Sequence, residues 1–240
     1  MAFTLPDYWL PRPAAPHTSD LARAFDRLID AAQESGAVDA LPYALEAPKW
    51  QFLCHLAEQQ GFVLHGSPDG DIEVFEPRQS SDLRAFGAQK AIYAASDGIW
   101  PMFFAILDRR AHPTSIINAC LRVEHPRGKV GAPHYFFSVQ GDTLALDPWT
   151  PGWVYILPGD NFFDEGEIPG GEDTWVRTAQ VASLQPVRPV GKLLVEPRDF
   201  PFLAQVRAHD GSRLAEYAQA MEQGMPWPDK ATSIDGNQKA

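Results

Sequence analysis

Apolar residues recur at helical spacing in two segments near the start of the chain. The first segment begins after Thr18 and Ser19, residue types that favour a helix N-cap, and it ends at Gly36. The second begins at Pro48 and ends at Gly61, and proline at the start with glycine at the end is typical of a helix. The pattern therefore predicts two helices within the first 61 residues.

From Phe62 onward the pattern changes to short apolar runs separated by turn residues, which is typical of β-strands. Gln140-Gly141-Asp142 separates two of these runs and predicts a β-hairpin. The predicted strands are 62–65, 72–75, 91–95, 116–123, 135–139, 143–146, 153–157, 174–181 and 193–195.

One helix, over residues 98–108, is predicted among these strands, and Ser212 is expected to cap another near the end of the chain. Strands and helices do not alternate, so a doubly wound parallel sheet is disfavoured. The pattern favours an α+β fold with a mostly antiparallel, split sheet.

Three regions are expected along the chain. Residues 1–61 form an extended, proline-rich arm and a helical cap. Residues 62–207 form the core, and residues 208–240 form a C-terminal helix and a polar tail.

Charge and composition narrow the classes of function. The 240 residues carry 20 basic and 31 acidic side chains, and 20 − 31 gives a net charge of −11. This balance argues against a nucleic-acid-binding protein, which needs clustered Lys and Arg. The 22 prolines fit many short elements better than a long helical bundle.

The expected location is the cytoplasm. No run of 18 apolar residues is present, and the first ten residues lack the basic and apolar regions of a signal peptide. Cys54 and Cys120 allow at most one disulfide bond, and two buried thiols are the simpler expectation. Neither cysteine has the paired spacing of a structural zinc site, so no metal is expected.

The common phosphate-loop, dinucleotide, zinc-protease and hydrolase motifs do not occur, so a site would combine residues from separate segments. The first candidate segment ends an apolar strand with His65-Gly66-Ser67. The second contains Tyr93 on a short strand followed by Ser96 and Asp97, either of which would cap the next helix. In the third, 171–181, Glu172 precedes an alternating strand. Taken singly, each has an ordinary structural explanation: a turn, a core tyrosine and a surface carboxylate.

Taken in order, the three segments resemble the ADP-ribosyltransferase superfamily, in the His-Tyr-Glu branch of diphtheria-like toxins and poly(ADP-ribose) polymerases. Leu64-His65-Gly66-Ser67 is similar to the His-Gly-Ser of the polymerases, and Ala91-Ile92-Tyr93-Ala94 to their Gly-Ile-Tyr-Phe-Ala. Glu172 is followed seven and eight positions later by Ala179-Gln180, as the polymerase glutamate is. Glu165 and Glu167 lie close by and are alternative candidates for the catalytic glutamate. The resemblance covers roughly residues 62–195 and implies an ADP-ribosyltransferase-like split sheet.

The resemblance also implies roles for individual residues. NAD is the substrate, and Glu172 faces the cationic ribose of an oxocarbenium-like transition state. His65 donates a hydrogen bond to a ribose hydroxyl, while Gly66 and Ser67 hold the nicotinamide carboxamide. Tyr93 stacks on the nicotinamide ring. A second aromatic ring, Phe103 or Phe104, covers the other side of the nicotinamide. A cation, Arg78 or Arg84, binds the diphosphate.

The expected function is therefore an NAD-dependent ADP-ribosyltransferase with an unidentified protein or small-molecule acceptor, or an NAD glycohydrolase that uses water. Two alternatives remain open. An RNA 2′-phosphotransferase on the same fold would need basic residues for an RNA phosphate, which the net charge disfavours. A non-catalytic module would bind NAD or a protein and use the fold only as a scaffold.

Overall fold

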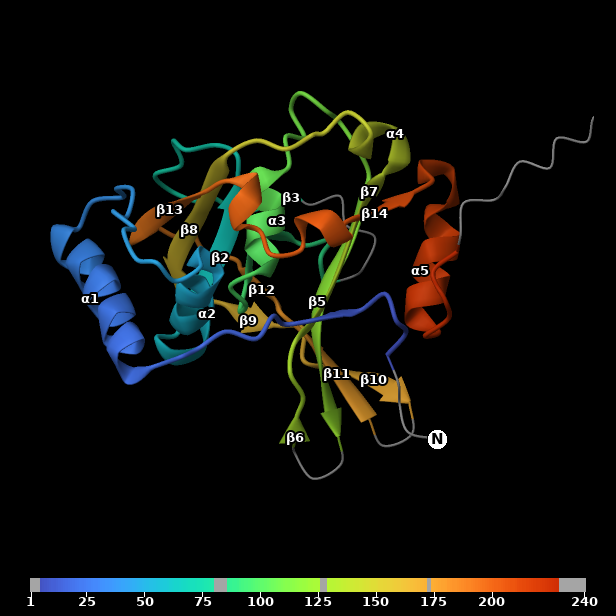
Figure 1. Ribbon diagram of the computed structural model, residues 1–240, viewed down its shortest axis with the longest axis horizontal. Coiled ribbons are helices and arrows are strands. Elements are labelled where there is room, and N and C mark those ends of the chain that lie inside the picture. Colours follow the sequence, from blue (N-terminus) through green and yellow to red (C-terminus); the bar gives the residue numbers. More distant parts are fainter. Residues whose placement is uncertain (1–4, 80–85, 126–128, 172–173, 229–240) are drawn as a thin grey trace, which may run out of the picture.

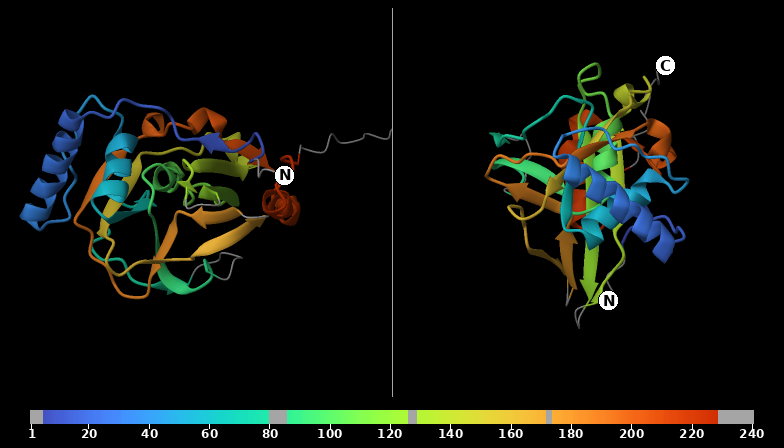
Figure 2. Two further views of the ribbon diagram at one scale, coloured as in Figure 1. Left: turned by 90° about the horizontal axis from the view of Figure 1, so that it is seen from below. Right: turned by 90° about the vertical axis from the view of Figure 1, so that its left-hand side faces the viewer.

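A computed structural model describes residues 5–79, 86–125, 129–171 and 174–228. Within these ranges the chain forms two β-sheets, with helices α1 and α5 at opposite ends of the molecule (Figures 1 and 2). None of the described helices is long and apolar enough to cross a membrane. The helices are α1 (Ser19–Ser35), α2 (Lys49–Gln59), α3 (Trp100–Ile106), α4 (Gly141–Leu144) and α5 (Leu214–Glu222), with 3-10 turns at Pro197–Asp199, Leu203–Gln205 and Gly211–Arg213.

The first sheet contains the strands that carry the His65 and Tyr93 segments. Its order is β13-β8-β2-β4-β12-β9, β3 adds to β4, and all neighbouring pairs are antiparallel. The strands are β2 (Phe62–Ser67), β3 (Arg78–Gln79), β4 (Lys90–Ala95), β8 (Gly152–Pro158), β9 (Phe163–Asp164), β12 (Gln180–Ser183) and β13 (Gly191–Val195).

The second sheet has the order β1-β7-β5-β11-β10, with β6 added to β5 and β14 to β7. Only the β14–β7 pair among the described strands is parallel. The predicted α+β class with mostly antiparallel strands is therefore confirmed. The strands are β1 (Leu10–Pro11), β5 (Ile116–His125), β6 (Lys129–Val130), β7 (His134–Gln140), β10 (Glu167–Gly171), β11 (Thr174–Thr178) and β14 (Arg207–His209).

One long predicted strand, 174–181, joins the two sheets. The structure divides it into β11, which pairs with β5, and β12, which pairs with β4. Ala179 lies at the division and bonds to both sheets: its N–H donates to the Cys120 carbonyl and its carbonyl accepts from the Ser96 N–H, both at 2.9 Å. A pattern of alternating residues indicates a strand but not the sheet to which each half belongs.

The first two helices form as predicted. The Thr18 hydroxyl accepts a hydrogen bond from the Leu21 N–H, and Gly36 ends α1 with φ +64°, a conformation that favours glycine. Phe25 of α1 and Phe52 of α2 lie in the same core cluster as residues of both sheets. The helices therefore share the main core of the protein.

Two predicted strands and one predicted helix cap are wrong. The run 143–146 is not a strand, because Gly141–Leu144 continues from β7 as a helical turn. The run 72–75 contributes only Phe75, which forms an isolated bridge with Val187. Asp210, rather than Ser212, caps the turn before α5, since its carboxylate accepts the Ser212 N–H.

Candidate functional site

His65 and Tyr93 lie on the neighbouring strands β2 and β4. The Nδ1 of His65 is 2.7 Å from the Tyr93 carbonyl oxygen. Because a carbonyl only accepts, Nδ1 carries the proton and donates it. Burial lowers the pKa of His65, so the ring is neutral near pH 7 and its Nε2 presents a lone pair.

The side chains of these two residues have different neighbours. The single ladder pair between β2 and β4 joins Leu64 to Ala95, and in that register Tyr93 is opposite Gly66 rather than His65. The two side chains therefore project from opposite sides of the strands. The His65 ring packs against Phe75, with centroids 4.7 Å apart, and the Tyr93 ring lies 6.4 Å from that of Phe86. The resemblance implies that both side chains face one NAD molecule, whereas this register turns them to opposite sides of the strands, and a ring-to-backbone hydrogen bond joins the residues instead.

The strands β2 and β4 separate beyond that single pair. Backbone groups of alternate residues point to the same side of a strand, so Gly66, two positions after Leu64, directs its N–H and C=O toward β4. Both strands are described in full, and no ladder pair with β4 includes Gly66. The Tyr93 carbonyl, which a continued ladder would pair with Gly66, is taken by His65. We call this opening between Gly66 and Tyr93 the β2–β4 gap.

Gly66 also has a packing role that the sequence did not suggest. A Cβ at this position would lie 1.8 Å from the Pro101 carbonyl oxygen and 2.9 Å from the Ala105 nitrogen, both in the backbone of α3. The absence of a side chain thus allows α3 to pack directly on β2, which suffices to explain the glycine.

We expect Gly66→Ala to destabilise the protein by about 1–3 kcal/mol, because backbone atoms of α3 must move to admit the methyl group. Urea unfolding monitored by circular dichroism measures the change. Gly36→Ala is the control for backbone strain without crowding. Nothing lies within 4 Å of a Cβ at Gly36, but its φ of +64° is unfavourable for alanine. An unfolding midpoint equal to that of the parent for Gly66→Ala would contradict the close approach.

The other residues assigned to NAD are dispersed. The Ser67 hydroxyl accepts from the Asp69 N–H at 3.1 Å and so supports a turn. Phe103 is completely buried in the main core, where its ring is 5.0 Å from that of Phe137. Phe104 is partly exposed and packs against Trp100 and Phe103.

Two predicted residues, Arg84 and Glu172, lie outside the described residues. Arg78 is exposed on β3, next to Ala91 of β4. Glu167 accepts a hydrogen bond from Arg177 at 2.9 Å and is exposed, and Glu165 is partly buried.

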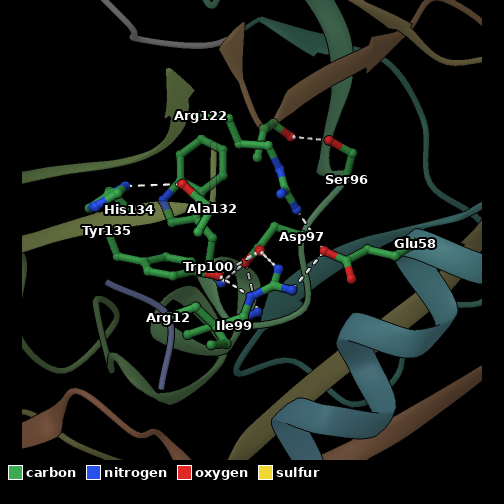
Figure 3. Close-up of polar contacts among 11 residues, drawn as sticks. Arg12, Glu58, Ser96, Asp97, Ile99, Trp100, Arg122, Ala132, His134 and Tyr135 are labelled. Atoms are coloured by element: carbon green, nitrogen blue, oxygen red, sulfur yellow. Dashed lines mark hydrogen bonds and ion pairs between the residues drawn. The ribbon is translucent and has the colours of Figure 1, made fainter. Parts of the chain in front are cut away.

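A buried polar network that sequence reasoning missed lies at the N-terminal end of α3. Asp97 is 1% exposed, and its Oδ1 accepts the N–H groups of Ile99 and Trp100 at 2.8 and 2.9 Å, so it caps α3 as one of the two predicted candidates. Its Oδ2 accepts from the Tyr135 hydroxyl at 2.7 Å and from Arg12 at 2.8 Å (Figure 3). Burial and the Asp97 charge raise the pKa of Tyr135, which keeps that hydroxyl a donor.

Arg12 connects the N-terminal arm to this network. Its guanidinium also contacts Glu58 of α2 at 2.7 Å, and Glu58 in turn accepts from Arg122 of β5 at 2.6 Å. Figure 3 shows the guanidinium between the two carboxylates. Arg12 lies between two prolines, in a segment without the helical or strand periodicity of apolar residues. The sequence pattern therefore did not reveal its part in the network.

The arm and α2 border a cavity of about 240 Å³. Within the described residues no group of three His, Cys, Asp or Glu side chains is placed to hold a metal ion. Cys54 and Cys120 are free, buried thiols. The cavity is lined by Arg12, Pro13, Ala15 and His17 of the arm and by Trp50, Gln51, Cys54, His55, Glu58 and Gln59 of α2.

Comparison of this chain with protein-family models, with curated proteins and with solved structures finds no match.

Proposed function

We propose that this protein breaks the nicotinamide–ribose bond of NAD at the β2–β4 gap, as an ADP-ribosyltransferase or an NAD glycohydrolase. The observation that carries the proposal is the backbone of Gly66, which faces the gap without a ladder partner in β4. An amide N–H and a C=O side by side match the two hydrogen-bonding atoms of a carboxamide, the group that nicotinamide presents.

The order of strands supports the same proposal. The His65 segment lies on β2, the Tyr93 segment on β4, and the Gln180-Val181 pair of the third motif on β12, and these strands are consecutive in the sheet. Segments up to 116 positions apart (181 − 65) thus lie on three consecutive strands, as an ADP-ribosyltransferase-like split sheet requires. In this proposal α1 and α2 are the helical cap of that fold.

The tautomer of His65 changes its proposed role. Since Nδ1 donates to the Tyr93 carbonyl, the neutral ring offers an acceptor at Nε2. We therefore assign His65 to accept a hydrogen bond from a ribose hydroxyl, the reverse of the direction expected from the sequence. Accepting this bond increases the electron density on the ribose oxygen, which favours the cationic transition state.

Glu172 precedes β11, and in this proposal its carboxylate faces the developing positive charge on the ribose. It also orients the acceptor, whether water or a hydroxyl, amine or thiol of another molecule. Loss of nicotinamide and bond formation to the acceptor balance the reaction, because the proton of the acceptor is released to solvent or to the carboxylate.

The experiment that tests the function is incubation of the full chain with NAD labelled separately in its nicotinamide and adenylate parts. Release of nicotinamide with label on protein supports a transferase. Release with free ADP-ribose supports a glycohydrolase. Intact NAD in the presence of cell extract would reject both and leave the scaffold role.

We expect NAD to stabilise the protein, because a ligand that binds the folded state shifts the unfolding equilibrium. At one hundred times the Kd the gain is about 2.7 kcal/mol, or roughly 5–11 °C in Tm for a chain of this size. Differential scanning fluorimetry measures the shift.

Tyr93→Ala removes the partly exposed ring beside the gap and should reduce the NAD-dependent part of that shift by half or more. Tyr43→Ala, another half-buried tyrosine, is the matched control, and its NAD-dependent shift should equal that of the parent. Equal shifts in both variants would place NAD elsewhere on the protein.

A further inference from the structure

Residues 207–228, which we call the C-terminal segment, attach to the edge of the second sheet. β14 pairs with residues 138–140 at the end of β7. α5 follows and buries Tyr217 and Ala220. Trp227 then packs on Phe136 of β7, with ring centroids 4.4 Å apart. The segment is therefore held by one short strand and by aromatic contacts.

His209 of β14 joins this segment to the sheet through both ring nitrogens. Its Nδ1 lies 2.8 Å from the Ser138 hydroxyl oxygen of β7, and its Nε2 lies 2.8 Å from the Ser115 hydroxyl oxygen, one residue before β5. His209 is 1% exposed, and Ser138 is completely buried. The ring also packs against Tyr217 of α5, with centroids 5.8 Å apart. One buried side chain thus contacts both sheet strands and the helix that follows.

The hydrogen bonds around His209 fit a neutral ring. The Ser115 hydroxyl donates to the Oε1 of Gln140 at 3.3 Å, so it accepts from the Nε2–H of His209. Nδ1 then has the lone pair and accepts from the Ser138 hydroxyl. A proton on Nδ1 would meet the hydroxyl hydrogen of Ser138, which has no other acceptor among the described residues. Protonation therefore buries a charge and breaks a hydrogen bond.

The charges near His209 do not compensate for this cost. Burial lowers the pKa of His209, and the neighbouring Asp210 carboxylate, which favours the charged ring, has the smaller effect. β7 and the residue before β5 face the ring with uncharged serines. The remaining charged groups on the adjoining elements are exposed or paired, and these are Arg207 of β14, Asp142 of α4 and the Arg213–Glu216 pair at the start of α5.

We propose that the C-terminal segment is an acid-sensitive element, which docks on the second sheet while His209 is neutral and is released when the ring takes up a proton. Release gives the second ring N–H water as an acceptor. It also separates Trp227 from Phe136 and Tyr8 and exposes the edge of β7 at residues 138–140. The proposal does not depend on the NAD reaction proposed above.

The direction of the pH effect follows from the lowered pKa of the docked ring. A histidine in water titrates near pH 6.5. Below that pH the released segment binds a proton that the docked segment does not, so docking is strongest above about pH 6.5 and weakens as the pH falls. For one proton, the equilibrium constant for release rises by up to about tenfold between pH 7.5 and pH 5.5.

Hydrogen exchange of the full chain at pH 7.5 and 5.5 tests the proposal. Each exchange rate is compared with the intrinsic rate at the same pH, which gives a protection factor that reports on opening. We expect the protection factors of β14 to fall about three- to tenfold at pH 5.5. Those of β13, at the edge of the first sheet, should change by less than about twofold.

His209→Gln removes the titrating group but keeps a donor and an acceptor for the two serines. The protection factors of β14 in this variant should be the same at both pH values, and the comparison within one variant is independent of how strongly the segment docks. His134→Gln makes the same change at the other end of β7, where β1 pairs, and should respond to pH as the parent does.

NMR titration of the His209 ring in the parent chain is a second measurement that needs no docked variant. Its midpoint should lie below pH 6.5.

Three results would overturn the proposal. Equal loss of protection in β13 and β14 would show that acid acts on the whole fold. A pH effect that persists in His209→Gln would assign it to another group. A His209 midpoint at or above pH 6.5 would show that the docked segment does not exclude the proton.

Discussion

Replacing Arg12 with methionine is expected to destabilise the protein by roughly 3–5 kcal/mol, a large share of the 5–15 kcal/mol typical of a folded protein. Methionine keeps much of the aliphatic volume of arginine but removes the charge. The Asp97 carboxylate, 1% exposed, would then lack its cationic partner and keep only the Tyr135 hydroxyl and two backbone N–H groups. Guanidinium unfolding monitored by fluorescence measures the loss.

Two further variants test the cause of this loss. Arg23 forms an exposed pair with Asp20 in the first turns of α1, and Arg23→Met should change stability by less than about 1 kcal/mol. Adding Asp97→Asn to Arg12→Met removes the buried charge while an amide oxygen still accepts the α3 N–H groups. Stability should partly recover in that double variant. If Arg12→Met resembles Arg23→Met, the network contributes no more than a surface ion pair.

Glu172→Gln is expected to reduce NAD turnover a hundredfold or more while NAD affinity changes little. Glutamine keeps the size and hydrogen-bonding capacity of the side chain but not the charge that would stabilise an oxocarbenium-like transition state. Loss of a preorganised electrostatic group of this kind typically costs 10²–10³ in kcat. The nicotinamide-release assay gives the rate, and calorimetric titration gives the affinity.

Glu167 and Glu165 provide the matched controls on the same segment. Glu167 is exposed and binds Arg177, which also contacts Glu124 and Asp164, so Glu167→Gln should affect a surface cluster and leave turnover nearly unchanged. Glu165→Gln should be equally mild. If Glu167→Gln is inactive and Glu172→Gln active, the third motif begins at another residue. Full activity in all three variants would reject the His-Tyr-Glu mechanism.

The parts of the fold that were predicted correctly depend on local chemistry. Thr18 caps α1 through its own hydroxyl and Gly36 ends it through its own backbone conformation, so neighbours in sequence suffice. The same holds for the class of fold, since short alternating runs favour antiparallel strands. The wrong hairpin, predicted from strands 135–139 and 143–146, shows the limit, because Gly-Asp after a strand suits a helical turn as well as a hairpin.

The parts that could not be predicted depend on distant partners. Nothing near Ala179 indicates that one strand changes sheets, because the bonds to Ser96 and Cys120 are made by backbone groups that every residue has. The geometry of the candidate site also depends on distant partners. The motifs indicated that His65 and Tyr93 belong to two strands and one site, but the register that sets their side chains on opposite sides comes from the Leu64–Ala95 pair.

The Arg12 contacts also bear on how the protein is made. Arg12 is bonded to residues 85 and 123 positions later, Asp97 and Tyr135. At about 5–20 residues per second, synthesis reaches Tyr135 roughly 6–25 s after Arg12. The arm therefore leaves the ribosome before Asp97 and Tyr135 and can dock on them only after both have been made. During that interval the Arg12 guanidinium lacks its buried partners and has only Glu58, made earlier, to pair with. The apolar face of α2 is uncovered at the same time, so a chaperone has access to both.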